Sequence, residues 1–561
     1  MTDSKVLASL ADEYWEARLQ AHPVMATAIG DRRFDDRLED ISPEGRAAWH
    51  ARLMELHDRV GRITTAQLDE EDRITQAALD EVIRTDVAIA DADRHAYSVD
   101  PLDGPQVGFL NIPAFQSVRT EDEAEDLLAR WRAMGPWVDD LIANLRRGAS
   151  DGRLGVRMLV GCVIEQLEET LARPDAEWPL AAPTRAVPDD WSDADADRFR
   201  SGLTDAIAVH IRPAFGRYRE FLVNEIQPRA RSDEQPGLVH LPGGDATYRS
   251  LVRAYTSLPT SPEEIHETGL AEVERIDVEL VELGARLLDT DGLAATLDRL
   301  RSDPALRFTQ GDEVFKVAEG SLWRASASID AWFGRLPLAP CEVVRMEPHE
   351  EKHSTIAYYR EPAVDGSRPG QYYINTSEPE TRPRYEAEAL AFHEAVPGHH
   401  LQTAIAQELA RLPDFRRFLG TTAYVEGWGL YAERLAVDMG LYSGDLDLFG
   451  VASFDAWRAC RLVVDTGMHA MGWSRGRAIG FMTEHTGLGA NNIANEVDRY
   501  IAMPGQALAY KLGQLELLCL REEARSRLGD AFDIRAFHDA VLGEGALPLP
   551  VLRRLVERRL A

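Results

Sequence analysis

Residues 391–402 read AFHEAVPGHHLQ and place three histidines and a glutamate close together. His393 and Glu394 begin like the HExxH motif, in which two histidines four residues apart bind one zinc ion and the glutamate acts as the base. The next histidines here, His399 and His400, come six and seven residues after the first. An unbroken α-helix would turn His399 away by about 120° and carry His400 about 10 Å along its axis. Neither histidine could then easily share a metal ion with His393.

Pro397 and Gly398 offer a way around this difficulty. A proline inside the helix would lose a hydrogen bond and collide with the carbonyl group of His393, and glycine permits the backbone angles of a break. We therefore predict that the helix is interrupted at these two residues. His399 then takes the place of the second HExxH histidine, and Glu394 points at a metal-bound water.

A catalytic zinc site needs three protein ligands, an open water position and a nearby carboxylate that accepts the proton of the water. Residues 423–433, AYVEGWGLYAE, predict a helix in which Glu426 and Glu433 share a face because they are seven residues apart. Glu426 is the predicted third ligand. Glu433 is either an alternative ligand or a partner that orients a histidine. Zn²⁺ is the predicted cofactor.

Attack of water on an amide creates a negative charge on the carbonyl oxygen, which hydrogen-bond donors stabilise. Tyr500, Tyr510 and His469 are the candidate donors. Each is also compatible with a plain packing role in a helix.

Three arginines near these motifs have two interpretations. Arg458, Arg461 and Arg499 could bind a substrate carboxylate with paired hydrogen bonds, or they could pair with the abundant acidic residues of the chain. The sequence favours the structural pairings.

The elements that must position these residues are mainly helices. Apolar residues recur at helical spacing along most of the 561 residues, and Ser261 with Glu264 predicts a capping box at the start of one helix. Residues 354–360 and 370–376 predict a hairpin instead, with Asp365, Gly366 and Pro369 in its loop. This hairpin is expected to pack, although its edge could pair with an extended substrate. We expect one large catalytic domain over residues 1–561, with possible lobes 1–245 and 246–561.

Composition excludes several classes of function. Sixty-two basic against ninety-four acidic residues give a net charge of -32, which disfavours nucleic-acid partners. Four scattered cysteines without a CxxC pair indicate neither a disulfide framework nor a thiolate metal site. The first twenty residues lack the pattern of an export signal, and no apolar run is long enough to span a bilayer. The sequence thus predicts a cytoplasmic protein without membrane partners.

Several motifs in order resemble the bacterial DUF885 family: HEAVPGHHLQ, AYVEGWGLYAE, RLVVDTGMHAMGW and RYIAMPGQALAYKLG, with EIHETGLAEVERI at residues 264–276. The resemblance is strong over residues 210–525. It extends to the large helical zinc peptidases of the neurolysin, angiotensin-converting-enzyme and thermostable-carboxypeptidase type. It implies a nearly all-α fold with a deep cleft between two helical lobes. The predicted hairpin would add a small sheet near the site.

The same resemblance implies roles for single residues. The metal ligands would be His393, His399 and Glu426, and the base would be Glu394. His469 and Tyr510 correspond to the late histidine and tyrosine that stabilise the transition state in the helical peptidases, so they become the preferred donors.

The sequence therefore predicts a zinc-dependent peptidase, either a carboxypeptidase or an oligopeptidase, that acts on short peptides. Two alternatives remain open. One is a metal-dependent hydrolase of a non-peptide amide or small metabolite, because fold similarity does not fix the chemistry. The other is a helical protein that binds metal without turnover.

Overall fold

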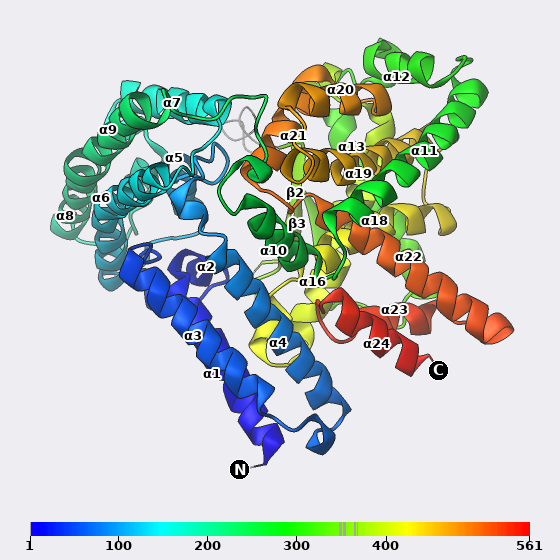
Figure 1. Ribbon diagram of the computed structural model, residues 1–561, viewed down its shortest axis with the longest axis horizontal. Coiled ribbons are helices and arrows are strands. Elements are labelled where there is room, and N and C mark those ends of the chain that lie inside the picture. The colour runs from blue at the N-terminus through cyan, green and yellow to red at the C-terminus, as the bar shows by residue number, and fades with distance from the viewer. Residues whose placement is uncertain (1, 347–350, 352–354, 364–365, 367, 561) are drawn as a thin grey trace.

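The computed structural model describes residues 2–346, 351, 355–363, 366 and 368–560 (Figure 1). These residues fold mainly into α-helices, with one small three-stranded sheet, as the sequence predicts. The deep cleft implied by the resemblance stays a prediction.

Helices α1 to α9 form two groups in Figure 1, and α10 lies between α4 and α22 (Leu508–Leu528). Helices α1, α3 and α4 pack against one another, and α6 to α9 form a neighbouring group around a core of their own. Thr120 caps the start of α6 by accepting a hydrogen bond from the backbone of Glu123. These elements are α1 (Asp3–Ala21), α2 (Pro23–Ala28), α3 (Pro43–Gly61), α4 (Glu70–Asp91), α5 (Pro105–Asn111), α6 (Glu121–Ser150), α7 (Arg157–Ala172), α8 (Asp193–Asp205), α9 (Arg212–Phe221) and α10 (Gly244–Thr256).

The later helices include α15, α16 and α18, which carry the predicted metal ligands. The predicted capping box of Ser261 and Glu264 is confirmed at the start of α11. The helices are α11 (Pro262–Leu287), α12 (Leu293–Ser302), α13 (Gly311–Ser328), α15 (Ala387–Glu394), α16 (His399–Glu408), α17 (Asp414–Phe418), α18 (Thr422–Asp438), α19 (Leu448–His469), α20 (Arg475–His485), α21 (Ala490–Ala502), α22 (Leu508–Leu528), α23 (Ile534–Leu542) and α24 (Leu549–Arg559).

Helix α19 runs through the interior of this second part and is buried on nearly all sides. It packs against α11, α15, α18, α20, α21 and α22. Its buried Asp455 accepts ion pairs from Lys511 at 2.6 Å, Arg434 at 2.6 Å and Arg275 at 3.0 Å. Burial alone would raise the pKa of Asp455, but these cations hold it well below its usual range. This ionic cluster ties α11, α18 and α22 to α19.

Helices α18 and α22 approach each other closely at two glycines. A methyl group on Gly427 would lie 2.5 Å from the backbone of Gly513, and one on Gly513 would lie 1.8 Å from the carbonyl oxygen of Ala423. Any side chain at either position would push the two helices apart. Glycine therefore fixes the spacing of the helices that carry Glu426 and Tyr510.

The sheet contains β1 (Cys341–Arg345), β2 (Ala357–Arg360) and β3 (Gly370–Ile374) in the order β1-β3-β2. β2 and β3 are antiparallel, which confirms the predicted hairpin, although Ser354 and Asp365 lie outside the described residues. β1 pairs with β3 in parallel and was not predicted, because none of its five residues is buried and its pattern is weak. The sheet packs against α13, α15 and α16.

One hydrophobic cluster joins distant parts of the chain. It contains side chains of α1, α3 and α4 together with side chains of α18, α22, α23 and α24. This cluster crosses residue 245, the boundary of the two predicted lobes. The division into lobes stays a prediction.

Candidate metal centre

The chain breaks its helix between the predicted ligands. α15 ends at Glu394 and α16 begins at His399, so the predicted interruption is confirmed. The Val396–Pro397 peptide bond between the two helices is cis. The indole Nε1 of Trp428 in α18 donates a hydrogen bond of 2.9 Å to the carbonyl oxygen of Pro397. The loop between the ligands is thus fixed to the helix that carries the third one.

Two glycines leave room for the histidine of α15. A methyl group on Gly398 would lie 1.9 Å from the carbonyl oxygen of His393. One on Gly429 of α18 would lie 2.6 Å from Cε1 of the same histidine. The sequence analysis did not single out Gly429. The available signal was a pair of glycines inside a predicted helix, where glycine costs about 1 kcal/mol relative to alanine.

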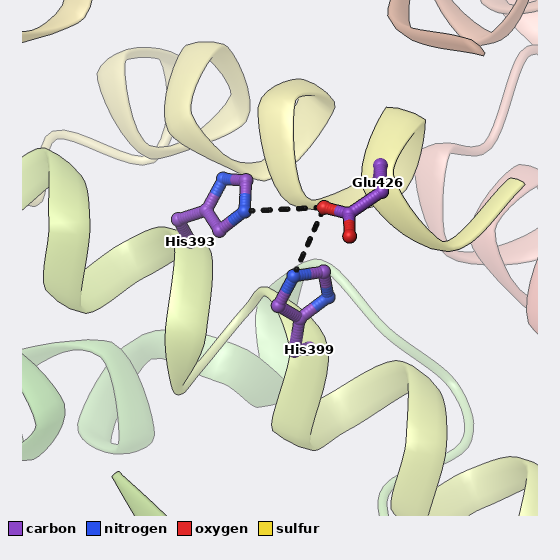
Figure 2. Close-up of side chains that lie close together, drawn as sticks. All are labelled: His393, His399 and Glu426. Carbon is purple, nitrogen blue, oxygen red and sulfur yellow. Dashed lines mark ion pairs between the residues drawn. The ribbon is translucent and has the colours of Figure 1, made fainter. Parts of the chain in front are cut away.

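The three predicted ligands lie together, as Figure 2 shows. Oε2 of Glu426 is 3.8 Å from Nε2 of His393 and 3.6 Å from Nε2 of His399. The two imidazole rings have centroids 4.6 Å apart and are nearly perpendicular. Among the histidine, cysteine, aspartate and glutamate side chains that the structure describes, these three form the one group close enough together to hold a metal ion.

The donor set fits a shared cation. Separations of 3.6 and 3.8 Å are too long for hydrogen bonds, and they approach the roughly 3.3 Å between ligands of a tetrahedral zinc ion. His393 is buried, whereas the side chains of His399 and Glu426 keep 12% and 22% of their surface exposed. The group is therefore open on the side of these two residues.

Glu433 orients His393 and does not join the trio. Its buried carboxylate accepts a hydrogen bond of 2.8 Å from Nδ1 of His393, which leaves Nε2 turned toward Glu426. Burial lowers the pKa of His393, but the carboxylates of Glu426 and Glu433 outweigh this effect and raise it to about 9. Of the two roles that the sequence left open for Glu433, the contacts match that of an orienting partner.

His400 lies away from the trio and contacts the sheet region. Its Nε2 donates to the carbonyl oxygen of Ala339 at 3.1 Å, and its Nδ1 accepts from the hydroxyl of Tyr359 at 3.0 Å. Burial lowers the pKa of His400 to about 4. His399 instead turns Nε2 to Glu426, and its buried Nδ1 has no hydrogen-bond partner among the described residues.

Comparison with known proteins places the chain in a family. The profile of a family described as bacterial protein of unknown function (DUF885) matches residues 23–556. The chain belongs to the DUF885 family. Among proteins with curated descriptions, none matches this DUF885 chain.

Two solved structures resemble this DUF885 protein over its length. One, described as a "putative lipoprotein" from Colwellia psychrerythraea, has 28% sequence identity and a TM-score of 0.92, and the match covers 100% of this chain and 99% of that chain. The other, a protein of Shewanella oneidensis described in the same words and as of unknown function, has 17% identity and a TM-score of 0.76 over 98% and 99% of the two chains. The second comparison shows a shared fold. No helix in the described part of the DUF885 chain is both long and apolar enough to cross a membrane.

Glu394, the predicted base, ends the helix that carries His393. Its carboxylate has no hydrogen-bond partner among the described residues of this DUF885 protein. Burial raises the pKa of Tyr372 in β3 well above its usual value, and the Glu394 carboxylate raises it further. The Tyr372 hydroxyl is buried without a hydrogen-bond partner in the described chain. The Glu394 carboxylate is thus close enough to both Tyr372 of the sheet and His393 of the trio for its charge to act on them.

Tyr510 lies beside the trio on α22. Burial raises its pKa, and the nearby Glu426 carboxylate raises it further. The guanidinium group of Arg461 lies 4.4 Å from the centre of the Tyr510 ring. The position of Tyr510 is compatible with its predicted role as a donor.

The other two candidate donors have their polar atoms occupied. His469 is fully buried, with Nε2 donating to the carbonyl oxygen of Tyr500 at 3.0 Å and Nδ1 accepting from the backbone N–H of Leu238 at 3.1 Å. The hydroxyl of Tyr500 donates to Glu496 at 2.7 Å and accepts from Trp457 and Arg461. These contacts correspond to packing roles, so His469 and Tyr500 have no part in the mechanism proposed below.

The predicted arginine pairings hold for two of the three residues. Nη2 of Arg461 and Nη2 of Arg499 each lie 3.1 Å from Oε2 of Glu496. Arg458 departs from the prediction, because it forms no ion pair within the described residues. Its nearest partners are the aromatic rings of Phe454 and Trp457.

Proposed function

We propose that this DUF885 protein is a metal-dependent hydrolase, and more narrowly a zinc peptidase that acts on short peptides. The observation that carries the proposal is the convergence of His393, His399 and Glu426, with Glu394 on the helix turn that supplies the first histidine. Two imidazoles and one carboxylate form the ligand set of many catalytic zinc sites. The partial exposure of the trio leaves access for a substrate.

The metal ion, when bound, supplies a Lewis acid that acidifies a water molecule and polarises a carbonyl group. Glu394 accepts one proton of the attacking water on a carboxylate oxygen while the water oxygen bonds to the carbonyl carbon. Glu394 then gives this proton to the departing nitrogen as the carbon–nitrogen bond breaks. The hydroxyl of Tyr510 donates a hydrogen bond to the oxygen on which negative charge develops.

The first experiment tests the metal and the base together. Protein prepared without chelator is expected to hold about one zinc per chain and to cleave members of a short-peptide library, detected by mass spectrometry. Glu394→Gln should keep the zinc and the fold but lose turnover by at least the 10²–10⁴-fold that is typical of general acid–base catalysis.

Each outcome has a defined meaning. The double variant His393→Ala, Glu426→Ala is the metal-free control. Equal zinc in this control and the wild type would refute the site. Undiminished cleavage by Glu394→Gln would refute the mechanism. Zinc binding without cleavage of any peptide or amide would support the alternative that this is a helical protein that binds metal but catalyses no reaction.

The compartment is also part of the proposal. The sequence predicts the cytoplasm, whereas the lipoprotein description of the two similar structures points to the cell envelope. We propose the cytoplasm, because all four cysteines are free, which fits a reducing compartment. Cell fractionation tests this, and recovery of a lipid-modified protein in the envelope fraction would contradict it.

A further inference from the structure

Arg458 is a buried cation that forms no ion pair with any residue that the structure describes. The residue keeps only 5% of its surface exposed, and its Nε and Nη1 atoms are buried without hydrogen-bond partners among the described residues. Its guanidinium group lies 4.2 Å from the ring centre of Trp457 and 4.4 Å from that of Phe454. A buried charge is costly unless it is paired. The guanidinium group of Arg458 is therefore left with N–H groups that the described protein residues do not satisfy.

Arg461, one turn further along α19, and Arg499 of α21 share one carboxylate. Arg461 and Arg499 both pair with Glu496, and Nη1 of Arg461 is buried without a partner in the described chain. We call Arg458, Arg461, Arg499 and Glu496 the arginine cluster. Three positive charges thus meet the carboxylate of Glu496, and the Glu433 carboxylate also acts on Arg458, in a protein whose net charge is -32. The excess of positive charge is local, and it suits an anion.

The arginine cluster adjoins the metal centre. Arg461 lies over the ring of Tyr510, which is close enough to Glu426 for that carboxylate to raise the tyrosine pKa. On the other side, the charge of Glu433 acts on Arg458 while the same carboxylate holds His393. A substrate at the metal centre would therefore have the arginine cluster within reach of its neighbouring groups.

We propose that the arginine cluster binds a carboxylate of the substrate, with Arg458 as its main contact. This inference rests on the proposed hydrolase function and narrows it to substrates with a carboxylate close to the bond that is cleaved. A guanidinium group matches a carboxylate well because its planar N–H groups can donate two parallel hydrogen bonds. The carboxylate belongs either to the C-terminus of a peptide or to an acidic side chain, and the experiment distinguishes these sources.

The binding test uses Glu394→Gln protein, in which turnover should be absent. Isothermal titration compares three pools of N-acetylated tripeptides: one with free C-termini, one with C-terminal amides, and one amidated with glutamate as the last residue. We expect the free acids to bind on the order of 10²-fold more tightly than the plain amides, as for a buried charge pair. Tight binding of the glutamate amides would assign the carboxylate to a side chain. Equal affinity for all three pools would overturn the inference.

Substitution of the arginine provides the second arm. Arg458→Gln should remove most of the preference for carboxylates and leave the affinity for plain amides unchanged. Arg477→Gln is the matched control, because Arg477 also stacks on a tryptophan, at 3.8 Å from Trp473, and lies outside the arginine cluster. A preserved preference in Arg458→Gln would overturn the inference.

Unfolding separates a ligand-binding arginine from a structural one. Without peptide, Arg458→Gln should unfold at a temperature equal to or above that of the wild type, because an unpaired buried charge is removed. Arg458→Met, which keeps an unbranched side chain over Trp457, should behave in the same way. Earlier unfolding of both variants would indicate a structural role and would contradict the inference.

Cleavage distinguishes the two levels of the proposal. If wild-type protein cleaves amidated and free peptides at equal rates, the hydrolase function stands and the carboxylate inference fails. If free acids bind selectively but no peptide is cleaved, the arginine cluster is supported and the peptidase function fails.

Discussion

Neighbouring histidines have different surroundings at the metal centre. His399 faces Glu426, whereas His400 is held by Tyr359 and a backbone carbonyl group at the sheet. Both begin α16, so about 100° of rotation about the helix axis separates their directions. One of the two can serve the metal, and the other packs.

This difference gives a prediction for metal binding. His399→Ala should abolish stoichiometric zinc, because one of the three ligands is lost. His400→Ala should keep about one zinc per chain. Elemental analysis of both variants, with circular dichroism to confirm folding, measures the outcome. Loss of zinc from the His400 variant alone would show that His400, and not His399, is the ligand.

The sequence could predict the residue types at this centre better than their partners. Spacing alone placed Glu426 and Glu433 on one face of a helix, about 10 Å apart along its axis, and left both as possible ligands. The choice depends on where α15 crosses α18, which local pattern does not encode. The unpaired state of Arg458 is likewise a property of the folded chain, because its neighbours come from α18, α21 and α22.

Helix α18 carries the third ligand and determines how closely its neighbours approach. Its glycines serve two different contacts, Gly427 toward the backbone of Gly513 and Gly429 toward the ring of His393. The sequence predicted this helix and the break between α15 and α16, because both depend on local residues. It did not predict β1, whose pairing with β3 spans 24 intervening residues, nor the close approach of α18 and α22.

Gly429→Ala tests the contact between α18 and the metal ligand. The added methyl group would lie 2.6 Å from Cε1 of His393 and should displace the imidazole. We expect zinc affinity to fall by about 10–100-fold, as when a partner that orients a ligand is lost. Gly216→Ala in α9 is the control, because nothing lies within 4 Å of its new methyl group. Competition with a chelator measures both affinities, and wild-type affinity in Gly429→Ala would be incompatible with the described geometry.

At the scale of the whole molecule, buried neutral histidines link stability to pH. His538 donates from Nδ1 to the carbonyl oxygen of Trp332 and accepts from the hydroxyl of Tyr431 at Nε2, each at 2.8 Å. Burial lowers the pKa of His538 to about 3, and it also lowers that of His469 to about 3. Both residues stay neutral in the folded state while the unfolded chain binds protons below about pH 6.5.

The sign of the effect follows from this difference. The contribution of each histidine is fully present above about pH 6.5 and is lost as the pH falls toward 3, at up to about 1.4 kcal/mol per pH unit. Urea unfolding of wild type and His538→Gln at pH 7, 6 and 5 isolates one residue. On acidification the free energy of unfolding should fall less in the variant than in the wild type, and the difference should approach about 1.4 kcal/mol per pH unit. The comparison is needed because burial raises the pKa of Asp465 to about 7, which acts in the opposite direction. Parallel pH curves for the two proteins would contradict the assignment.

The hydrophobic cluster that joins α1, α3 and α4 to α18 and α22–α24 has a consequence during synthesis of the chain. The first three of these helices leave the ribosome long before their partners are translated. About 330 residues separate the end of α4 from the start of α18, so at about 5–20 residues per second the interval is roughly 15 to 65 seconds. Throughout that time α1, α3 and α4 have one another to pack against, but the apolar side chains that contact α18 and α22–α24 lack these partners. We therefore expect the nascent chain to depend on chaperones that shield its early helices until translation is nearly complete.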